Sequence, residues 1–128
     1  MQWTEQAQLL LRKAVADAVI VSRGVADSGI TDEILGFHVQ QAAEKCLKAV
    51  LCHQGITYRR THDLQELADL LIDAGASVPP EIADLCAWSP FAVAYRYEDW
   101  PPSSAIDREH ANELTHAAIA WARRLIGP

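Results

Sequence analysis

Apolar residues recur at helical spacing along almost the whole chain, and no alternating run is long enough to predict a strand. The pattern predicts an all-α fold, an up-and-down antiparallel bundle of about five helices. We expect these helices to cover about Thr4–Ser22, Thr31–Gly55, Asp63–Gly75, Pro79–Ala87 and Ser104–Gly127. At 128 residues the chain is large enough for a proper hydrophobic core, and we expect residues 1–128 to form a single domain.

Polar residues at the expected helix starts predict where three of these helices begin. Thr31 precedes an acidic first turn, Asp63 is followed by Glu66 in the spacing of a capping box, and Ser104 is followed in the same way by Asp107. In the last helix, the residues expected to face the core are Leu114, Ala117, Ala118, Trp121 and Leu125. The first helix is apolar on nearly every side, which predicts burial or an oligomer contact.

A polar stripe borders the apolar face of the second helix. Phe37, Gln41, Glu44 and Lys48 fall within roughly 60° of one another at about 100° per residue. In the simpler interpretation, Glu44 and Lys48 form a surface ion pair one helical turn apart. In the alternative, Gln41 and Lys48 face a groove between helices and bind a ligand or a partner chain.

Two shorter stretches are further candidates for contact with an anion. Arg59, Arg60 and His62 precede a helix start, which is a plausible phosphate site; they could also be solvated side chains around a capped helix end. Arg96 stands between two tyrosines, one of them Tyr97, and could stack or present its guanidinium to a phosphate or base. It could equally pair with a neighbouring acid and hold its own loop.

The charge distribution supports a discrete anionic ligand rather than a long phosphate backbone. The chain carries a formal net charge of −6, which argues against a protein that coats nucleic acid. Residues 37–62 contain four lysines and arginines against Glu44 alone, a local balance of +3, so the rest of the chain carries −9. The alternative is that these basic side chains are simply solvated.

Cysteine usage and hydropathy indicate a cytoplasmic protein. The three cysteines are odd in number and form no CxxC pair, so we expect buried free thiols. No apolar run approaches the roughly 20 residues needed to span a bilayer, and the first residues do not resemble a signal peptide. We find no metal-ligand spacing, phosphate-binding loop or nucleophile motif, and expect neither a metal nor a cofactor.

Three runs, FHVQQAAEKCLKAVL, GITYRRTHDLQELADLL and AYRYEDW, together resemble the HEPN family, the higher eukaryote and prokaryote nucleotide-binding domains. The resemblance implies a helical bundle that forms a homodimer and works with a minimal nucleotidyltransferase partner, as a nucleotide- or RNA-handling accessory domain without catalysis of its own. In that role the ligand-binding residues would be Gln41, Glu44, Lys48, Arg60, His62, Arg96 and Tyr97. We assign no catalytic residue.

Many members of that family are metal-independent ribonucleases, often toxins, whose motif is an arginine, four to six residues and a histidine. No histidine follows Arg96 or Arg108 at this distance, because His116 comes one position too late. Two alternatives stay open. One is an endoribonuclease, the toxin of a toxin–antitoxin pair, in which a dimer brings His62 to Arg96. The other is a pure assembly module with the first helix as its dimer face.

Overall fold

The computed structural model describes residues 2–92 and 106–127, and this part of the chain contains helices and loops but no strand. The elements are α1 (Gln2–Gly24), α2 (Asp32–His53), α3 (Leu64–Asp73), α4 (Pro80–Leu85), the 3-10 helix η1 (Cys86–Trp88) and α6 (Arg108–Ile126). The predicted all-α bundle is confirmed. None of the helices in the described ranges is long and apolar enough to cross a membrane.

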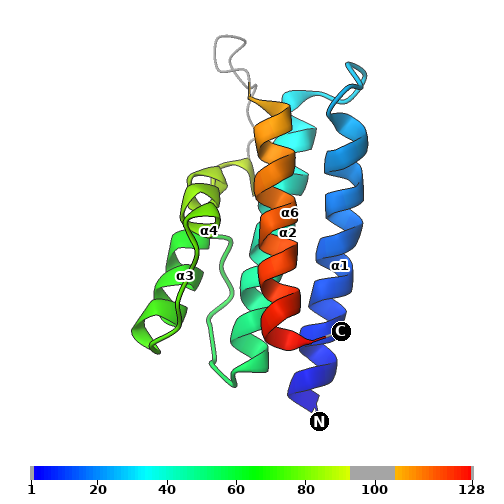
Figure 1. The fold of residues 1–128 in the computed structure, drawn as a ribbon. Coiled ribbons are helices and arrows are strands. Elements are labelled where there is room, and N and C mark those ends of the chain that lie inside the picture. The colour runs from blue at the N-terminus through cyan, green and yellow to red at the C-terminus, as the bar shows by residue number, and fades with distance from the viewer. Residues whose placement is uncertain (1, 93–105, 128) are drawn as a thin grey trace.

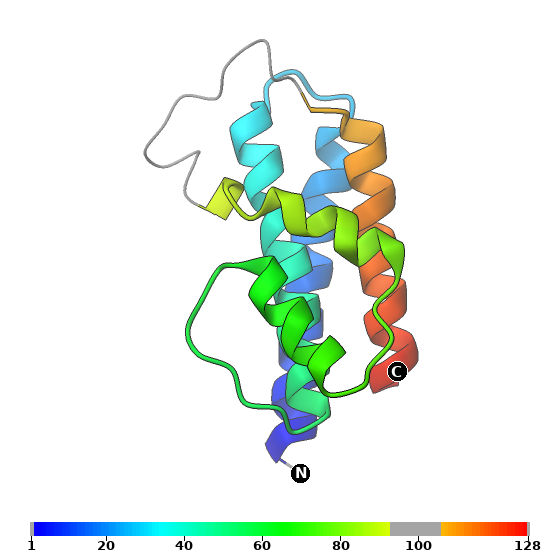
Figure 2. The ribbon, with the colours of Figure 1, turned by 90° about the vertical axis from the view of Figure 1, so that its left-hand side faces the viewer.

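Three long helices, α1, α2 and α6, lie side by side and form the body of the molecule (Figure 1). α1 is antiparallel to the other two. α2 and α6 run in the same direction, because the segment between them returns the chain to the end of the bundle where α2 begins (Figure 2). The shorter α3 and α4 lie on the side of the bundle away from α1, so α1 forms one edge of the molecule (Figure 1).

Polar caps begin three of the helices, two of them at the predicted residue. The Thr31 side chain accepts a hydrogen bond from a backbone N–H of the first turn of α2, and the Asp63 side chain does the same for α3. The Glu66 carboxylate bonds to Arg59, however, so it does not complete a capping box. The predicted cap of the last helix is wrong: α6 is capped by Asp107, and Ser104 lies outside the described residues.

The buried face of α6 is wider than the predicted stripe, because the helix packs against α1, α2 and α4. Leu114, Ala118 and Trp121 are buried as predicted. Leu125, in the last turn, is 41% exposed, and Ile126 is buried in its place. The prediction for Leu125 is therefore wrong, because one continuous stripe does not describe a helix with neighbours on several sides.

Arg108 fastens the start of α6 to the turn between α1 and α2. Its guanidinium donates to the backbone carbonyls of Gly24 at 2.7 Å, Asp27 at 3.0 Å and Ile30 at 2.6 Å. It also donates to the Asp32 carboxylate at 2.9 Å. Because the planar guanidinium carries five donors, one side chain can bond several carbonyls at the end of α1 and in the turn. Two of them, those of Gly24 and Asp27, also accept backbone N–H groups of the turn.

A second close approach brings Phe91 onto α2. Gly36 has no side chain, and a Cβ built there would overlap the Phe91 ring. Phe91 is buried and stacks on Trp88, with the ring centroids 5.1 Å apart. Gly36 therefore lets the chain after η1 pack directly on the α2 backbone.

Candidate functional site

Glu44, on α2, is the centre of a buried polar network. Its Oε1 accepts hydrogen bonds from the Gln40 amide at 3.0 Å and from Nδ1 of His62 at 2.8 Å. Its Oε2 accepts from the Lys48 ammonium at 3.0 Å. The carboxylate is buried, and a buried charge is tolerated only when it is paired and hydrogen-bonded, as it is here.

Gln40 extends this network and was not predicted from the sequence. Its side chain is fully buried, and its amide nitrogen also donates to the backbone carbonyl of His62 at 3.0 Å. Its carbonyl oxygen accepts from the Gln41 side chain at 2.7 Å. Its contact with Glu44 could have been predicted, because Gln40 precedes Glu44 by four residues and interrupts an otherwise apolar helix face.

The pKa of Glu44 reflects two opposed effects. Burial raises the pKa of the carboxyl group, and the hydrogen bonds from Gln40, His62 and Lys48 lower it. The hydrogen bonds and the Lys48 charge outweigh burial, so the pKa of Glu44 lies below its ordinary 4.5. Glu44 is therefore a carboxylate at neutral pH and holds its three donors in place.

His62 is fixed at one nitrogen and open at the other. A carboxylate can only accept, so Nδ1 of His62 carries the proton that is shared with Glu44. The side chain is 59% exposed, and Nε2 has no partner among the residues that the structure describes. In neutral His62, Nε2 is therefore the unprotonated nitrogen and can act as a hydrogen-bond acceptor.

Lys48 is held between Glu44 and an aromatic ring. The predicted ion pair with Glu44 is present, and the Lys48 ammonium also lies 5.6 Å from the centroid of the Tyr58 ring, within cation–π range. Only 15% of the Lys48 side chain is exposed. The ion pair of the simpler interpretation is thus present. It is part-buried rather than on the surface, and Lys48 links it to the loop before α3.

The local excess of positive charge is mostly neutralised by carboxylates from outside residues 37–62. Arg59 pairs with Glu66 at 2.6 Å, and Lys45 pairs with Asp17 of α1. Arg60 is exposed and forms no ion pair within the described ranges. Among the described residues, the predicted basic patch therefore reduces to one unpaired cation, Arg60, two residues from His62.

A second buried carboxylate, Asp17, was also missed by the sequence interpretation. It joins α1 to α2, because its two oxygens accept from Nδ1 of His38 at 2.9 Å and from the Lys45 ammonium at 2.5 Å. This cluster is separate from Glu44. Neither carboxylate belongs to a metal-binding group, since the described residues include no set of three His, Cys, Asp or Glu side chains that could hold a metal ion.

The structure thus joins four of the seven predicted ligand-binding residues, Gln41, Glu44, Lys48 and His62, in one network. Arg60 lies two positions before His62 without a bond to the network within the described residues. Arg96 and Tyr97 lie outside the described residues, so their position relative to Glu44 stays a prediction. Gln40 and Tyr58 are the additions that the structure makes.

Comparison with known proteins places the whole chain in one family. A family model described as the HEPN domain matches residues 3–126. A crystal structure of an archaeal HEPN homologue superposes with a TM-score of 0.53 at 22% sequence identity, covering 98% of this chain and 95% of that one. A search of curated proteins found no match.

Proposed function

This chain belongs to the HEPN domain family, and from that membership we propose that it is a nucleotide- or RNA-handling accessory domain without catalysis of its own. In this proposal it is a cytoplasmic homodimer that works with a minimal nucleotidyltransferase. Lys48, Arg60 and Arg96 contact phosphate, Tyr97 stacks or anchors, and Gln41 and His62 give hydrogen bonds. Glu44 positions Lys48 and His62 for these contacts.

The observation that carries the proposal is the arrangement around His62. Glu44 fixes its Nδ1 and leaves Nε2 open to solvent, while the exposed Arg60 stands two residues away with no carboxylate partner in the described part of the chain. An unpaired guanidinium two positions from an oriented imidazole offers both charge and a directed hydrogen bond to a phosphate or a base. Arg59 would first have to release both oxygens of its own partner, the Glu66 carboxylate.

Two neighbouring arginines provide the test. We expect Arg60→Ala to weaken binding of a labelled nucleotide or a short RNA about tenfold or more, the effect of losing a hydrogen bond to a charged group. Arg59→Ala is the matched control, because its guanidinium is already paired with Glu66, and it should change affinity little. Equal effects from both would contradict the site. No saturable binding at all, in a stable dimer, would favour an assembly module.

The partner is tested independently, by recovering the tagged protein from its native cells and identifying what comes with it. A nucleotidyltransferase in near-stoichiometric amount supports the accessory role. Recovery of this chain alone, under conditions that preserve weak complexes, contradicts it.

The Glu44–His62 pair also favours a second candidate function, a metal-independent endoribonuclease. A general base needs an unprotonated nitrogen facing its substrate, and the Glu44 contact gives His62 that tautomer. Arg96 would supply the cation for the phosphorane charge. This candidate predicts RNA cleavage in excess EDTA that His62→Ala or Arg96→Ala abolishes. Absence of cleavage by the wild-type protein rules it out and leaves the accessory role.

A further inference from the structure

The outer face of α1 carries exposed apolar side chains although no described element covers it. Leu9, Val19 and Ile20 are 38%, 44% and 37% exposed, and Ala16 between them is exposed as well. α2 and α6 lie on the other sides of the helix, and α1 forms the edge of the bundle (Figure 1). Large apolar side chains gathered on one face of a surface helix indicate an interaction site rather than scattered exposure.

Hollows along this face make it a surface that a second helix could fill. One of about 660 Å³ lies between α1 and α6 and is lined by residues that include Leu11, Arg12 and Ala16. Another, of about 200 Å³, continues past Val19 to Arg23, and a third, of about 470 Å³, begins at Glu5. The three follow α1 over most of its length.

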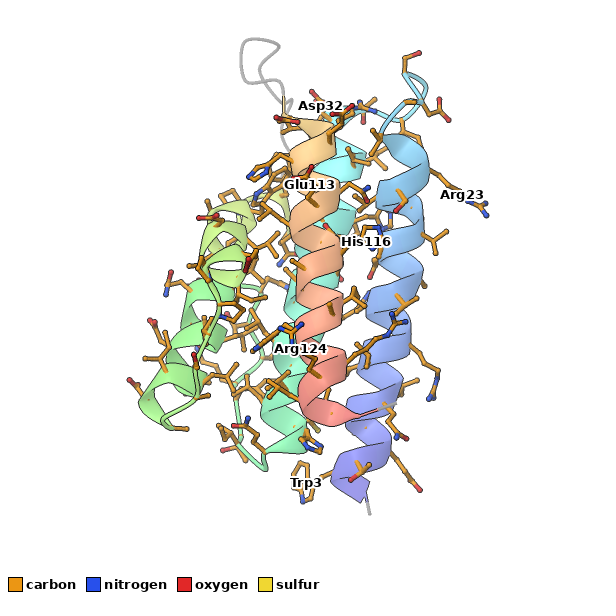
Figure 3. All side chains as sticks on the ribbon, viewed as in Figure 1. Trp3, Arg23, Asp32, Glu113, His116 and Arg124 are labelled. Carbon is orange, nitrogen blue, oxygen red and sulfur yellow. The ribbon has the colours of Figure 1, made fainter. Side chains whose placement is uncertain are left out.

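Two opposite charges mark the ends of the same face. Glu5 and Arg23 are eighteen residues apart, which is five full helical turns, so they have the same angular position on α1. Both are exposed, and neither forms an ion pair within the described ranges. Arg23 points away from the bundle (Figure 3). At about 1.5 Å per residue they are about 27 Å apart, too far to pair within one chain.

Symmetry supplies a partner for each of these groups. Two identical helices can pack antiparallel about a twofold axis that passes at the level of residue 14. Each residue then faces the partner residue whose number, added to its own, gives 28. Glu5 then faces the partner's Arg23, and Leu9 faces the partner's Val19. Arg12 faces the partner's Ala16, whose small side chain leaves room for the arginine stem. A twofold axis repeats each of these contacts.

Glu5 and Arg23 point in the same direction from the axis of α1, and the other four residues of these pairs point within 40° of it. All six can therefore lie in one contact between two helices. The parallel arrangement is excluded by charge, because it would place Glu5 against Glu5 and Arg23 against Arg23. In the antiparallel arrangement, Glu5 and Arg23 form an ion pair at each end, Leu9 and Val19 pack inside these pairs, and the Arg12 stems lie at the centre over the partner's Ala16. Opposite charges at the rim of an interface fix its register.

We infer that α1 is the dimer contact of this protein, packed antiparallel on α1 of a second copy with Glu5 opposite the partner's Arg23 and Leu9 opposite the partner's Val19. The inference rests on the homodimer of the proposed function and specifies its face and register. It is independent of whether the Glu44 network binds a nucleotide, because that network joins α2 to the loop before α3.

Charge exchange tests the register. Light scattering and sedimentation should show a dimer for the wild-type protein, and a dissociation constant raised about tenfold or more for Glu5→Arg or Arg23→Glu alone. Glu5→Arg combined with Arg23→Glu should restore the dimer, because the exchanged charges again face each other. Arg124→Glu, on α6 and outside all three hollows, is the matched control and should leave the dimer intact.

The outcomes separate this inference from the proposed function. A dimer unaffected by either single exchange overturns the α1 face but leaves the homodimer standing. Failure of the double exchange to restore the dimer overturns the register. A wild-type monomer at high concentration overturns both, while nucleotide binding is measured separately. Circular dichroism of each variant shows whether the helices are intact.

Cross-linking offers a second readout of the same register. A protein carrying both Leu9→Cys and Val19→Cys should form an intermolecular disulfide under mild oxidation, because the two positions face each other across the twofold axis. Either single variant should not, because each cysteine then faces an unchanged valine or leucine. A cross-link in one of the single variants, at the same yield as in the double variant, contradicts the pairing.

Discussion

Nδ1 of His62 lies 2.8 Å from Oε1 of Glu44, although the two residues are 18 positions apart in the chain. This bond ties the middle of α2 to the loop that leads into α3. It makes Glu44 both a stabilising group, through its buried charge, and a positioning group, through the imidazole that it orients. The two roles can be separated by measuring stability and binding on the same variants.

The lowered pKa of Glu44 predicts a defined dependence of stability on pH. A carboxyl group with a lower pKa in the folded state stabilises the fold above its ordinary pKa, and this contribution is lost as the pH falls through the folded value. We therefore expect the Glu44 contribution to the free energy of unfolding to decline below about pH 4.5.

Glu44→Gln isolates this contribution from those of the other carboxylates. At pH 7 we expect the variant to lose about 2 kcal/mol of unfolding free energy, because the amide cannot satisfy Lys48 and His62 as the carboxylate does. The difference from the wild-type protein should shrink as the pH falls below about 4.5, measured by urea unfolding. A difference that stays constant would show that Glu44 does not titrate in this way.

Arg108→Lys should destabilise the protein although it keeps the charge. The ammonium of lysine cannot reach three carbonyls and the Asp32 carboxylate as the forked guanidinium does. We expect a loss of about 2 kcal/mol in the free energy of unfolding, because several hydrogen bonds from a charged group are lost. Arg124→Lys, at an exposed position of the same helix, should change it by less than about 0.5 kcal/mol.

Gly36→Ala should be destabilising although alanine is the better helix former. Alanine would gain up to about 1 kcal/mol in helix propensity, but its methyl group would overlap the buried Phe91 ring. Because overpacking in a core costs about 1–3 kcal/mol, we expect a net loss by thermal or urea unfolding. The exposed Gly29→Ala is the control. Unchanged stability of the Gly36 variant would show that Phe91 can move aside.

The three native thiols should react slowly with alkylating reagents. Burial raises the pKa of Cys46 to about 12 and that of Cys86 to about 11, and it also raises the pKa of Cys52. At pH 8 the thiolate fraction of Cys46 is then on the order of 10⁻⁴. Iodoacetamide should modify the cysteine of an Ile72→Cys variant, at a 51% exposed position of α3, far faster. In urea all four thiols should react alike.

Helix positions could be predicted because their signals are local. Thr31 and Asp63 cap the helices that they were expected to begin, since a cap depends only on the few residues that follow it. Glu44 and Lys48 are one helical turn apart, so their ion pair also follows from spacing alone.

Contacts between distant segments could not be predicted in this way. The bond from Asp17 to His38 depends on how α1 and α2 are aligned, and no short-range pattern records that alignment. The role of Arg108 was equally hidden, because most of its acceptors are backbone carbonyls, which every residue carries. Gln40 is different, because its distance of four residues from Glu44 was visible in the sequence.

The contacts of Arg108 also bear on the order of events during folding. Its bond to Asp32 joins residues 76 positions apart, and its bond to Gly24 spans 84. Closing a loop of this length costs on the order of 4 kcal/mol of chain entropy, whereas the hairpin of α1 and α2 needs only a short turn. The hairpin should therefore form before α6 docks, and loss of the Arg108 contacts should accelerate unfolding while leaving the refolding rate nearly unchanged.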